Sequence, residues 1–129
     1  KNNTIDVLAD GKAITKNINK NIVTDNTPLE NPKDPDSSNI YQLYQLISSE
    51  KDAIAMANNL KKGGYGWGHA KKALSNEIIE KFSEAREKFN YYSENPKLVE
   101  QVLIEGANKA SIVANKTLSR VRSVLGYSS

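Results

Sequence analysis

Apolar residues recur along this chain every three or four positions, which is the spacing of one face of an α-helix. The first such stripe is Ile14, Ile18 and Ile22, and the Asp10 that precedes it is a residue type that caps helix N-termini. Lysines occupy other faces of the same segment. The pattern predicts an amphipathic helix that begins after Asp10 and ends near Thr24.

Two shorter stripes follow a loop over residues 24–36, where three prolines prevent a helix from passing through. Ser37 or Ser38 can cap the first of these helices, and Ser49 can cap the second. Gly63 ends the second helix, because glycine adopts the left-handed conformation of a helix terminus at little cost. The predicted inner faces are Ile40, Leu43, Tyr44 and Ile47 in one helix and Ala53, Met56, Ala57 and Leu60 in the other.

The last two predicted helices are the longest. One runs from about Trp67 to Ser93, and the other starts with Asn95 as its cap and Pro96 at its first position and ends at Gly126. Their predicted buried faces are Ala70, Leu74, Ile78, Phe82, Ala85 and Phe89 in one helix and Val99, Val102, Leu103, Gly106, Ala110, Val113, Thr117, Val121 and Val124 in the other.

The hydrophobic pattern as a whole predicts an all-α bundle of about five helices over residues 10–129, preceded by an extended lead-in over residues 1–9. The length of 129 residues fits one domain. No apolar run approaches the ~20 residues that span a membrane, so we expect no membrane contact. The first residue is Lys and not Met, and we expect the chain to be a piece of a longer protein.

The modest net charge of +3 conceals two stretches that contain no acidic residue. Residues 61–72 carry four lysines, four glycines and the only Trp and His of the chain, and residues 108–129 carry four more cations. Aromatic rings beside lysines favour an anionic partner with stackable bases, such as single-stranded nucleic acid. The structural alternative is also open: glycines punctuate helix junctions, a Trp anchors a core, and cations suit a helix C-terminus.

Catalytic and metal-binding groups are scarce. The absence of cysteine excludes disulfides, cysteine-ligated zinc or iron–sulfur sites and thiol catalysis, and it fits a reducing cytoplasm. The single His69 lies in a glycine turn, the acidic residues follow helix-pair spacing, and the glycine-rich turn lacks the preceding strand of a phosphate-binding motif. We predict that this chain holds no catalytic residue, metal or cofactor and runs no reaction by itself.

Five short motifs, in order along the chain, resemble bacterial tryptophanyl-tRNA synthetases of class I. Asn2-Asn3-Thr4-Ile5 is similar to the segment that follows the KMSKS signature, and Ile22-Val23-Thr24-Asp25 is similar to "VTDS", with Asn26 in place of Ser. The other three are the proline-rich loop over residues 28–36, the "GxGxAKK" helix entry over residues 66–72, and the "EGAxKA…A.KTL" motif over residues 105–118.

The resemblance implies that the chain is the C-terminal, helical anticodon-binding domain of an enzyme that attaches tryptophan to its tRNA. It implies ATP and magnesium as cofactors of the parent enzyme, a separate catalytic domain and a homodimer. Some relatives bind an iron–sulfur cluster through cysteines, which this chain lacks, so that feature is not carried over.

The pattern and the resemblance together suggest a set of tRNA-contacting residues. Lysines and arginines would meet phosphates, aromatic rings would stack on bases, and polar groups would meet base edges. The candidates are Lys62, Tyr65, Trp67, His69, Lys71, Lys72, Asp25, Asn26, Arg120 and Arg122. The alternative hypothesis is a protein-interaction bundle without an RNA role, based on the small residues Ala53, Ala57 and Gly106.

Overall fold

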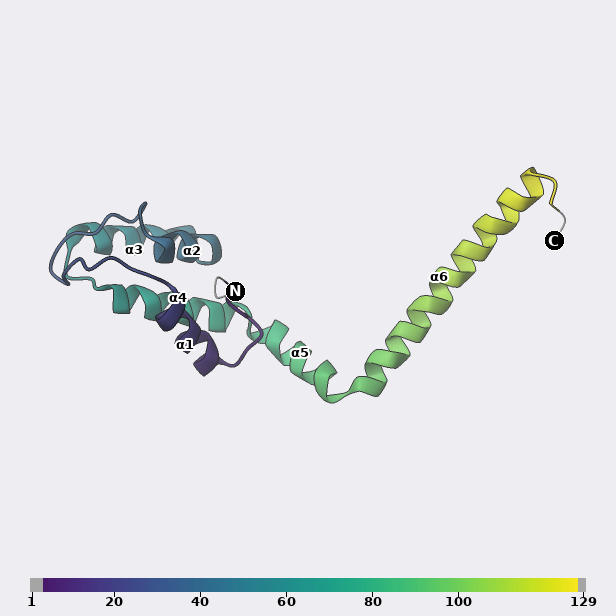
Figure 1. The fold of residues 1–129 in the computed structure, drawn as a ribbon, viewed down its shortest axis with the longest axis horizontal. Helices are drawn as coiled ribbons and strands as arrows, with labels where there is room; N and C mark the ends of the chain where they lie inside the picture. The colour runs from purple at the N-terminus through teal and green to yellow at the C-terminus, as the bar shows by residue number, and fades with distance from the viewer. Residues whose placement is uncertain (1–3, 128–129) are drawn as a thin grey trace. The chain divides into compact units, whose positions relative to one another are not determined.

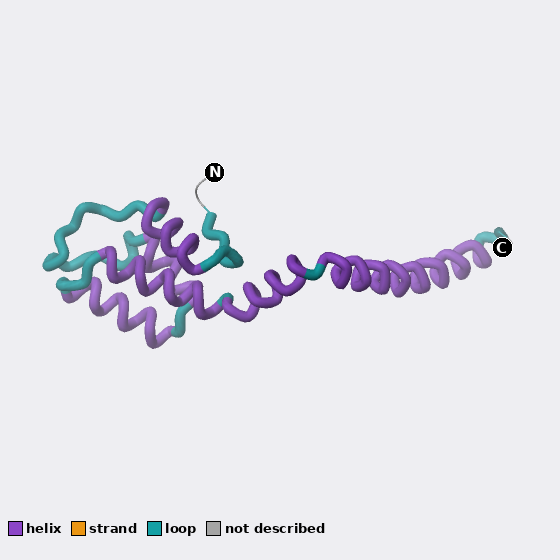
Figure 2. Tube along the Cα trace, turned by 90° about the horizontal axis from the view of Figure 1, so that it is seen from below, coloured by secondary structure: helices purple, strands orange, loops and turns teal. Residues whose placement is uncertain are grey.

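The computed structural model describes residues 4–127, which contain six α-helices and no strand (Figures 1 and 2). The helices are α1 (Gly11–Asn21), α2 (Asn39–Ile47), α3 (Glu50–Lys62), α4 (Trp67–Lys81), α5 (Ser83–Glu94) and α6 (Pro96–Val124). Two compact units, residues 1–87 and 88–129, are described separately below. The all-α prediction is confirmed. Asn2 and Asn3 of the first motif lie outside the described residues.

Three of the predicted N-caps form as expected. Asp10 accepts hydrogen bonds from the backbone N–H groups of Lys12 and Ala13 at 2.8 and 2.9 Å. Ser38 caps α2, and Ser49 accepts a hydrogen bond from the N–H of Asp52 at 3.2 Å. These side chains satisfy backbone donors that a helix leaves free in its first turn, so the sequence fixes where the helices begin.

The core of the first unit gathers the apolar faces of the first four helices. Helix α4 packs against α1 and α2, and α2 packs against α3. Ile18, Leu60 and Leu74 are completely buried in this core. The predicted faces of α1–α3 therefore meet as expected, with Tyr41 as a further buried residue. Within residues 4–127, no helix is both long and apolar enough to cross a membrane.

The single helix expected over residues 67–93 is interrupted at Phe82, which gives six helices where about five were predicted. Phe82 has φ −101° and ψ 14°, outside the helical region. The carbonyls left without their helical partners are taken by side chains: Ser83 Oγ donates to Glu80 O at 2.8 Å, and Arg86 Nη1 donates to Ile79 O at 3.3 Å. Hydrophobic periodicity does not report side-chain contacts of this kind, so it did not predict the break at Phe82.

Arg86 also fastens the lead-in to the helices. Its Nε donates to Ala9 O at 2.8 Å, and its Nη2 donates to Val7 O at 3.2 Å. A guanidinium offers five donors in a rigid fork, which suits a segment with unpaired backbone carbonyls. One half-buried side chain thus joins residues 7–9 to the start of α5.

The second unit contains α6, and here the prediction of a buried face was wrong. No residue of α6 is buried, and Leu103 and Val113 are 67% and 66% exposed. Pro96 starts the helix as expected, but Asn95 makes no capping bond and donates to Tyr91 O at 2.7 Å. Gly126 follows the helix with φ +78°, which confirms its predicted role at the C-terminus.

Candidate nucleic-acid interface

The glycine turn between α3 and α4 is built against the proline-rich loop. Gly63 and Gly64 both have positive φ, at 82° and 75°. A Cβ on Gly63 would lie 2.3 Å from Glu30 O, and the N–H of Gly64 donates to Leu29 O at 3.0 Å. Glycine is therefore required at position 63 by both its backbone conformation and the close approach of the loop.

Trp67, the first residue of α4, is joined to the "VTDS"-like segment. Its indole Nε1 donates to Asp25 Oδ1 at 2.7 Å, across 42 positions of sequence. Asp25 Oδ1 also accepts from the N–H of Thr27 at 2.9 Å. Hydrogen bonds from Thr27, through its side chain and its backbone, and then from Trp67 hold the pKa of the Asp25 carboxyl below its ordinary value. The sequence prediction named both residues but not their contact.

Lys33 is the structural centre of the proline-rich loop, and the sequence reasoning did not single it out. Only 4% of its surface is exposed. Its Nζ donates to the carbonyls of Pro28, Leu29 and Asn31 at 2.8, 3.2 and 3.0 Å and lies 6.0 Å from the centre of the Trp67 ring. A lysine between prolines carries no periodic signal, so only the folded loop reveals that it is buried.

Tyr65 of the glycine turn faces His69 in the first turn of α4. Their ring centres are 5.5 Å apart, and His69 Nδ1 accepts from the N–H of Gly66 at 3.4 Å. Burial raises the pKa of the Tyr65 phenol, while His69 is exposed. The tilted pair leaves His69 accessible to a partner and anchors Tyr65 against the core.

The two adjacent lysines of α4 have different surroundings. Lys71 is half-buried, and its Nζ donates to Asn19 O at 3.1 Å, in the last turn of α1. Lys72 is exposed, as is Lys62 at the end of α3. The structure therefore gives Lys71 a contact within the fold and leaves Lys62 and Lys72 accessible to solvent.

A small polar pocket lies beside Trp67. Its volume is about 90 Å³, and it is lined by residues 23–25, residues 37–39 and Trp67. Asp25 and Trp67 form part of its wall, whereas Asn26 is exposed on the neighbouring loop. The pocket brings a carboxylate, two serines and an asparagine together with an indole, which is a set of groups able to bond to the polar edge of a base.

The remaining two candidates, Arg120 and Arg122, belong to the second unit. Both are exposed on α6, and the backbone carbonyl of Arg122 accepts from the N–H of Tyr127 at 2.9 Å. In the part of the chain that the structure describes, no group of three or more His, Cys, Asp or Glu side chains could hold a metal ion.

Sequence comparisons connect the whole chain to one kind of enzyme. No protein-family model matches the chain. It is 38% identical over 125 residues to the tryptophan–tRNA ligase of Fusobacterium nucleatum and 38% identical over 121 residues to that of Rhodopirellula baltica. These matches cover 97% and 94% of this chain and 38% of each relative. The chain thus spans about two fifths of the length of the curated relatives it matches.

Solved structures give the same result. A tryptophanyl-tRNA synthetase from Campylobacter jejuni matches 96% of this chain at a TM-score of 0.85 and 36% identity, and the match covers 40% of that protein. A second structure of the enzyme from the same organism, complexed with ADP and tryptophan, matches with a TM-score of 0.87. In sequence and in fold, this chain therefore corresponds to the C-terminal region of the tryptophanyl-tRNA synthetases.

Proposed function

We propose that this chain is the tRNA-binding C-terminal part of a tryptophan–tRNA ligase and that it receives the anticodon of the tryptophan tRNA. The observation that carries the proposal is the match to tryptophan–tRNA ligases over 97% of the chain. In this proposal the parent enzyme is a cytoplasmic homodimer, and the portion of it outside this chain attaches tryptophan. In the same proposal, ATP and magnesium bind in that portion as well.

The accessible cations of the first unit supply the electrostatic part of binding. Lys62 and Lys72 are exposed near the two ends of the glycine turn, and His69 is exposed between them. Exposed ammonium groups attract phosphates and release counterions, which gives affinity without sequence information. Lys71 acts differently, because its ammonium group already bonds to Asn19 O.

The polar pocket beside Trp67 supplies the base-reading part. A volume of about 90 Å³ admits the edge of a nucleobase. A carboxylate has several acceptor positions, so Asp25 retains capacity beyond the bonds from Trp67 and Thr27. Carboxylates accept hydrogen bonds from the N4 amino group of cytosine, which is present twice in a CCA anticodon. In this arrangement Trp67, with Lys33 Nζ 6.0 Å from its ring, forms one wall of the pocket, Asp25 meets the base inside it, and Asn26 meets the base from the neighbouring loop.

Fluorescence anisotropy with labelled tRNA tests the proposal. The chain is expected to bind tryptophan tRNA in low salt, to prefer it over the same tRNA with an altered anticodon, and to lose affinity steeply as salt rises. Lys62→Ala and Lys72→Ala are each expected to lower the slope of log affinity against log salt by about one unit. Lys51→Ala, at the other end of α3, is the matched control and should leave the slope unchanged.

Two results would overturn the proposal. One is equal affinity for the tryptophan tRNA and the altered tRNA, and the other is no binding at any salt concentration. A salt slope that Lys62→Ala and Lys72→Ala do not change would remove these lysines from the interface.

A protein-interaction role remains the second candidate, because α6 exposes large apolar side chains. Leu103, Ile112 and Val113 are each more than half exposed. Patches of this kind mark protein contacts in many folded chains. Size-exclusion chromatography with light scattering separates the two functions, since an interaction module should self-associate and ignore tRNA.

A further inference from the structure

Three lysines form a line along the outer side of α1. Lys12, Lys16 and Lys20 recur every four residues, so their positions are about 6 Å apart along the helix axis. All three are exposed, and α1 contains no acidic residue. They border one shallow hollow on the helix surface, which is also lined by Gly11, Thr15 and Asn19. None of the three lysines is among the tRNA-contacting residues that the sequence predicts.

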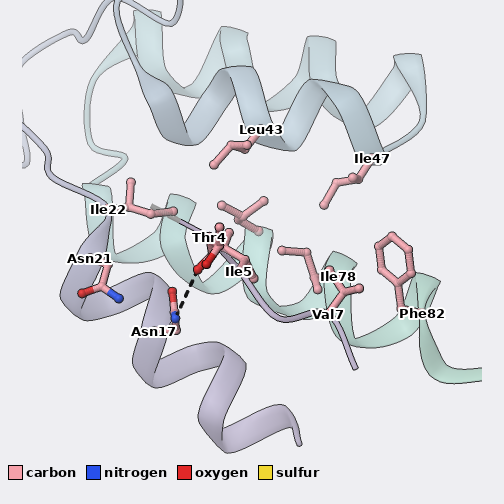
Figure 3. Close-up of a pocket in the computed structure, with 11 residues that line it drawn as sticks. Thr4, Ile5, Val7, Asn17, Asn21, Ile22, Leu43, Ile47, Ile78 and Phe82 are labelled. Atoms are coloured by element: carbon pink, nitrogen blue, oxygen red, sulfur yellow. Dashed lines mark hydrogen bonds between the residues drawn. The ribbon is translucent and has the colours of Figure 1, made fainter. Parts of the chain in front are cut away.

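The opposite side of α1 faces the core. Ile14 and Ile18 are almost completely buried, and Figure 3 shows Asn17 and Ile22 pointing into the apolar pocket between the lead-in, α2 and α4. A helix that lies on a membrane surface inserts its apolar face into the lipid. Because the apolar face of α1 is already covered, its lysines do not fit a helix of that kind.

The lysines of α1 are placed where they work against the stability of the helix. Lys16 lies four residues from both Lys12 and Lys20, and like charges at this spacing repel each other. Lys12 is also in the first turn, where the helix dipole disfavours a cation. Helix α3 shows the favourable arrangement, with Glu50 and Asp52 in its first turn. Helix stability thus gives no reason for the lysines of α1, whereas a polyanion on this side would offset both penalties.

Helix α1 runs antiparallel to α4 and leads away from the glycine turn. Near the start of α4, Lys71 Nζ donates to Asn19 O at 3.1 Å, close to the end of α1. At the other end of the pair, a Cβ on Gly11 would lie 3.2 Å from Ile79 Cδ1. The line of lysines therefore begins beside the first turns of α4, where the candidate RNA surface lies, and extends away from it.

We propose that the line of lysines on α1 binds phosphates of the anticodon stem and so continues the RNA interface beyond the glycine turn. Each lysine carries a compact charge on a flexible stem, so the three ammonium groups can meet successive phosphates of one strand. Such contacts add affinity and orient the RNA, but they carry no sequence information. This inference rests on the proposed tRNA-binding function and extends it to a surface that the function did not use.

Fluorescence anisotropy with the tryptophan tRNA, and with its anticodon stem-loop alone, tests the inference on the 129-residue chain. Lys12→Ala, Lys16→Ala and Lys20→Ala are each expected to lower the slope of log affinity against log salt by about one unit with both RNAs. The preference for the tryptophan anticodon over an altered one should not change. Lys51→Ala is the matched control, because Lys51 is the second residue of α3 as Lys12 is of α1, and it should leave the slope unchanged.

A charge reversal separates RNA binding from helix stability. Lys16→Glu places a glutamate four residues before Lys20, which is a favourable pair in a helix, so the melting temperature should stay the same or rise. The affinity for tRNA should fall by roughly tenfold or more in low salt, because a phosphate contact is lost and a repulsive charge is added. Lysines that only keep the helix surface solvated would give no change in tRNA affinity.

The inference is overturned if none of the three alanine variants changes the salt slope, or if Lys16→Glu binds tRNA as tightly as the unaltered chain. It is also overturned if the variants affect the whole tRNA but not the stem-loop, because the contact would then lie outside the anticodon stem. In these cases the tRNA-binding proposal stands, with Lys62 and Lys72 as its tests. If the chain binds no tRNA at any salt concentration, both proposals fail, so the two failures are distinct.

Discussion

Helices α1–α4 and helix α6 carry the same kind of apolar stripe, yet only the first four bury it. Ile14, Ile18 and Leu74 are buried to 99% or more, whereas Val113 on α6 is 66% exposed. The stripes of α1 and α2 both meet that of α4, since both helices pack against α4. The difference teaches that a periodic apolar face predicts a helix, but that burial depends on what else is present to cover the face.

Core truncation should show the largest contrast between the two regions. Leu74→Ala removes a completely buried side chain from α4, so we expect a loss of about 2–5 kcal/mol in the free energy of unfolding. Val113→Ala on α6 should change it by less than about 0.5 kcal/mol. Urea denaturation of both variants measures the difference, and equal losses would show that α6 is buried in solution.

Glycine substitutions should have opposite signs in the two regions. Gly63→Ala places a Cβ 2.3 Å from Glu30 O at a positive φ, so we expect a loss of about 1–3 kcal/mol. Gly106→Ala on α6 meets no atom within 4 Å and should stabilise the helix by up to about 1 kcal/mol. Thermal melting tests both variants. A lower melting temperature for Gly106→Ala would contradict the open surroundings of this glycine on α6.

The neighbouring lysines of α4 give a smaller and more local contrast. Lys71→Ala removes the hydrogen bond to Asn19 O and should cost about 0.5–1.5 kcal/mol of stability. Lys72→Ala should leave stability within about 0.5 kcal/mol and weaken tRNA binding instead. Urea denaturation measures stability and anisotropy measures tRNA binding, both on the same preparations. If Lys72→Ala lowered stability and Lys71→Ala weakened tRNA binding alone, the two assignments would be reversed.

Acid titration should give the smallest effect, at the contact between Asp25 and Trp67. The pKa of Asp25 is lower in the folded chain than its ordinary value of about 3.9. The stabilisation from its hydrogen bonds is therefore complete above about pH 3.9, and it is lost as the pH falls through the lower pKa of the folded chain. Trp67 is the only tryptophan, so its fluorescence reports this step directly. Asp25→Asn should remove the step, and a midpoint above the ordinary value would contradict the direction of the shift.

The candidate interface was predicted in part. Asp25, Trp67 and the glycine turn were identified from residue types and from motif resemblance, and the structure joins Asp25 to Trp67. Lys33 and Arg86 were not identified, although each binds three backbone carbonyls. The carbonyl partners of Lys33 lie within an irregular loop. Those of Arg86 lie 7, 77 and 79 positions away in sequence. None of these relations leaves a periodic pattern.

The sequence by itself determined most of the helices, most of their caps and the similarity to tryptophanyl-tRNA synthetases. Local backbone geometry and side-chain period act within a few residues, so Asp10 and Ser49 place helix starts without reference to the rest of the chain. Only the tertiary structure decided which charged groups are free and which are engaged. Lys33, Lys71 and Arg86 carry the same charge as Lys62 and Lys72, but folding brings backbone carbonyls to the first three and leaves the other two in solvent.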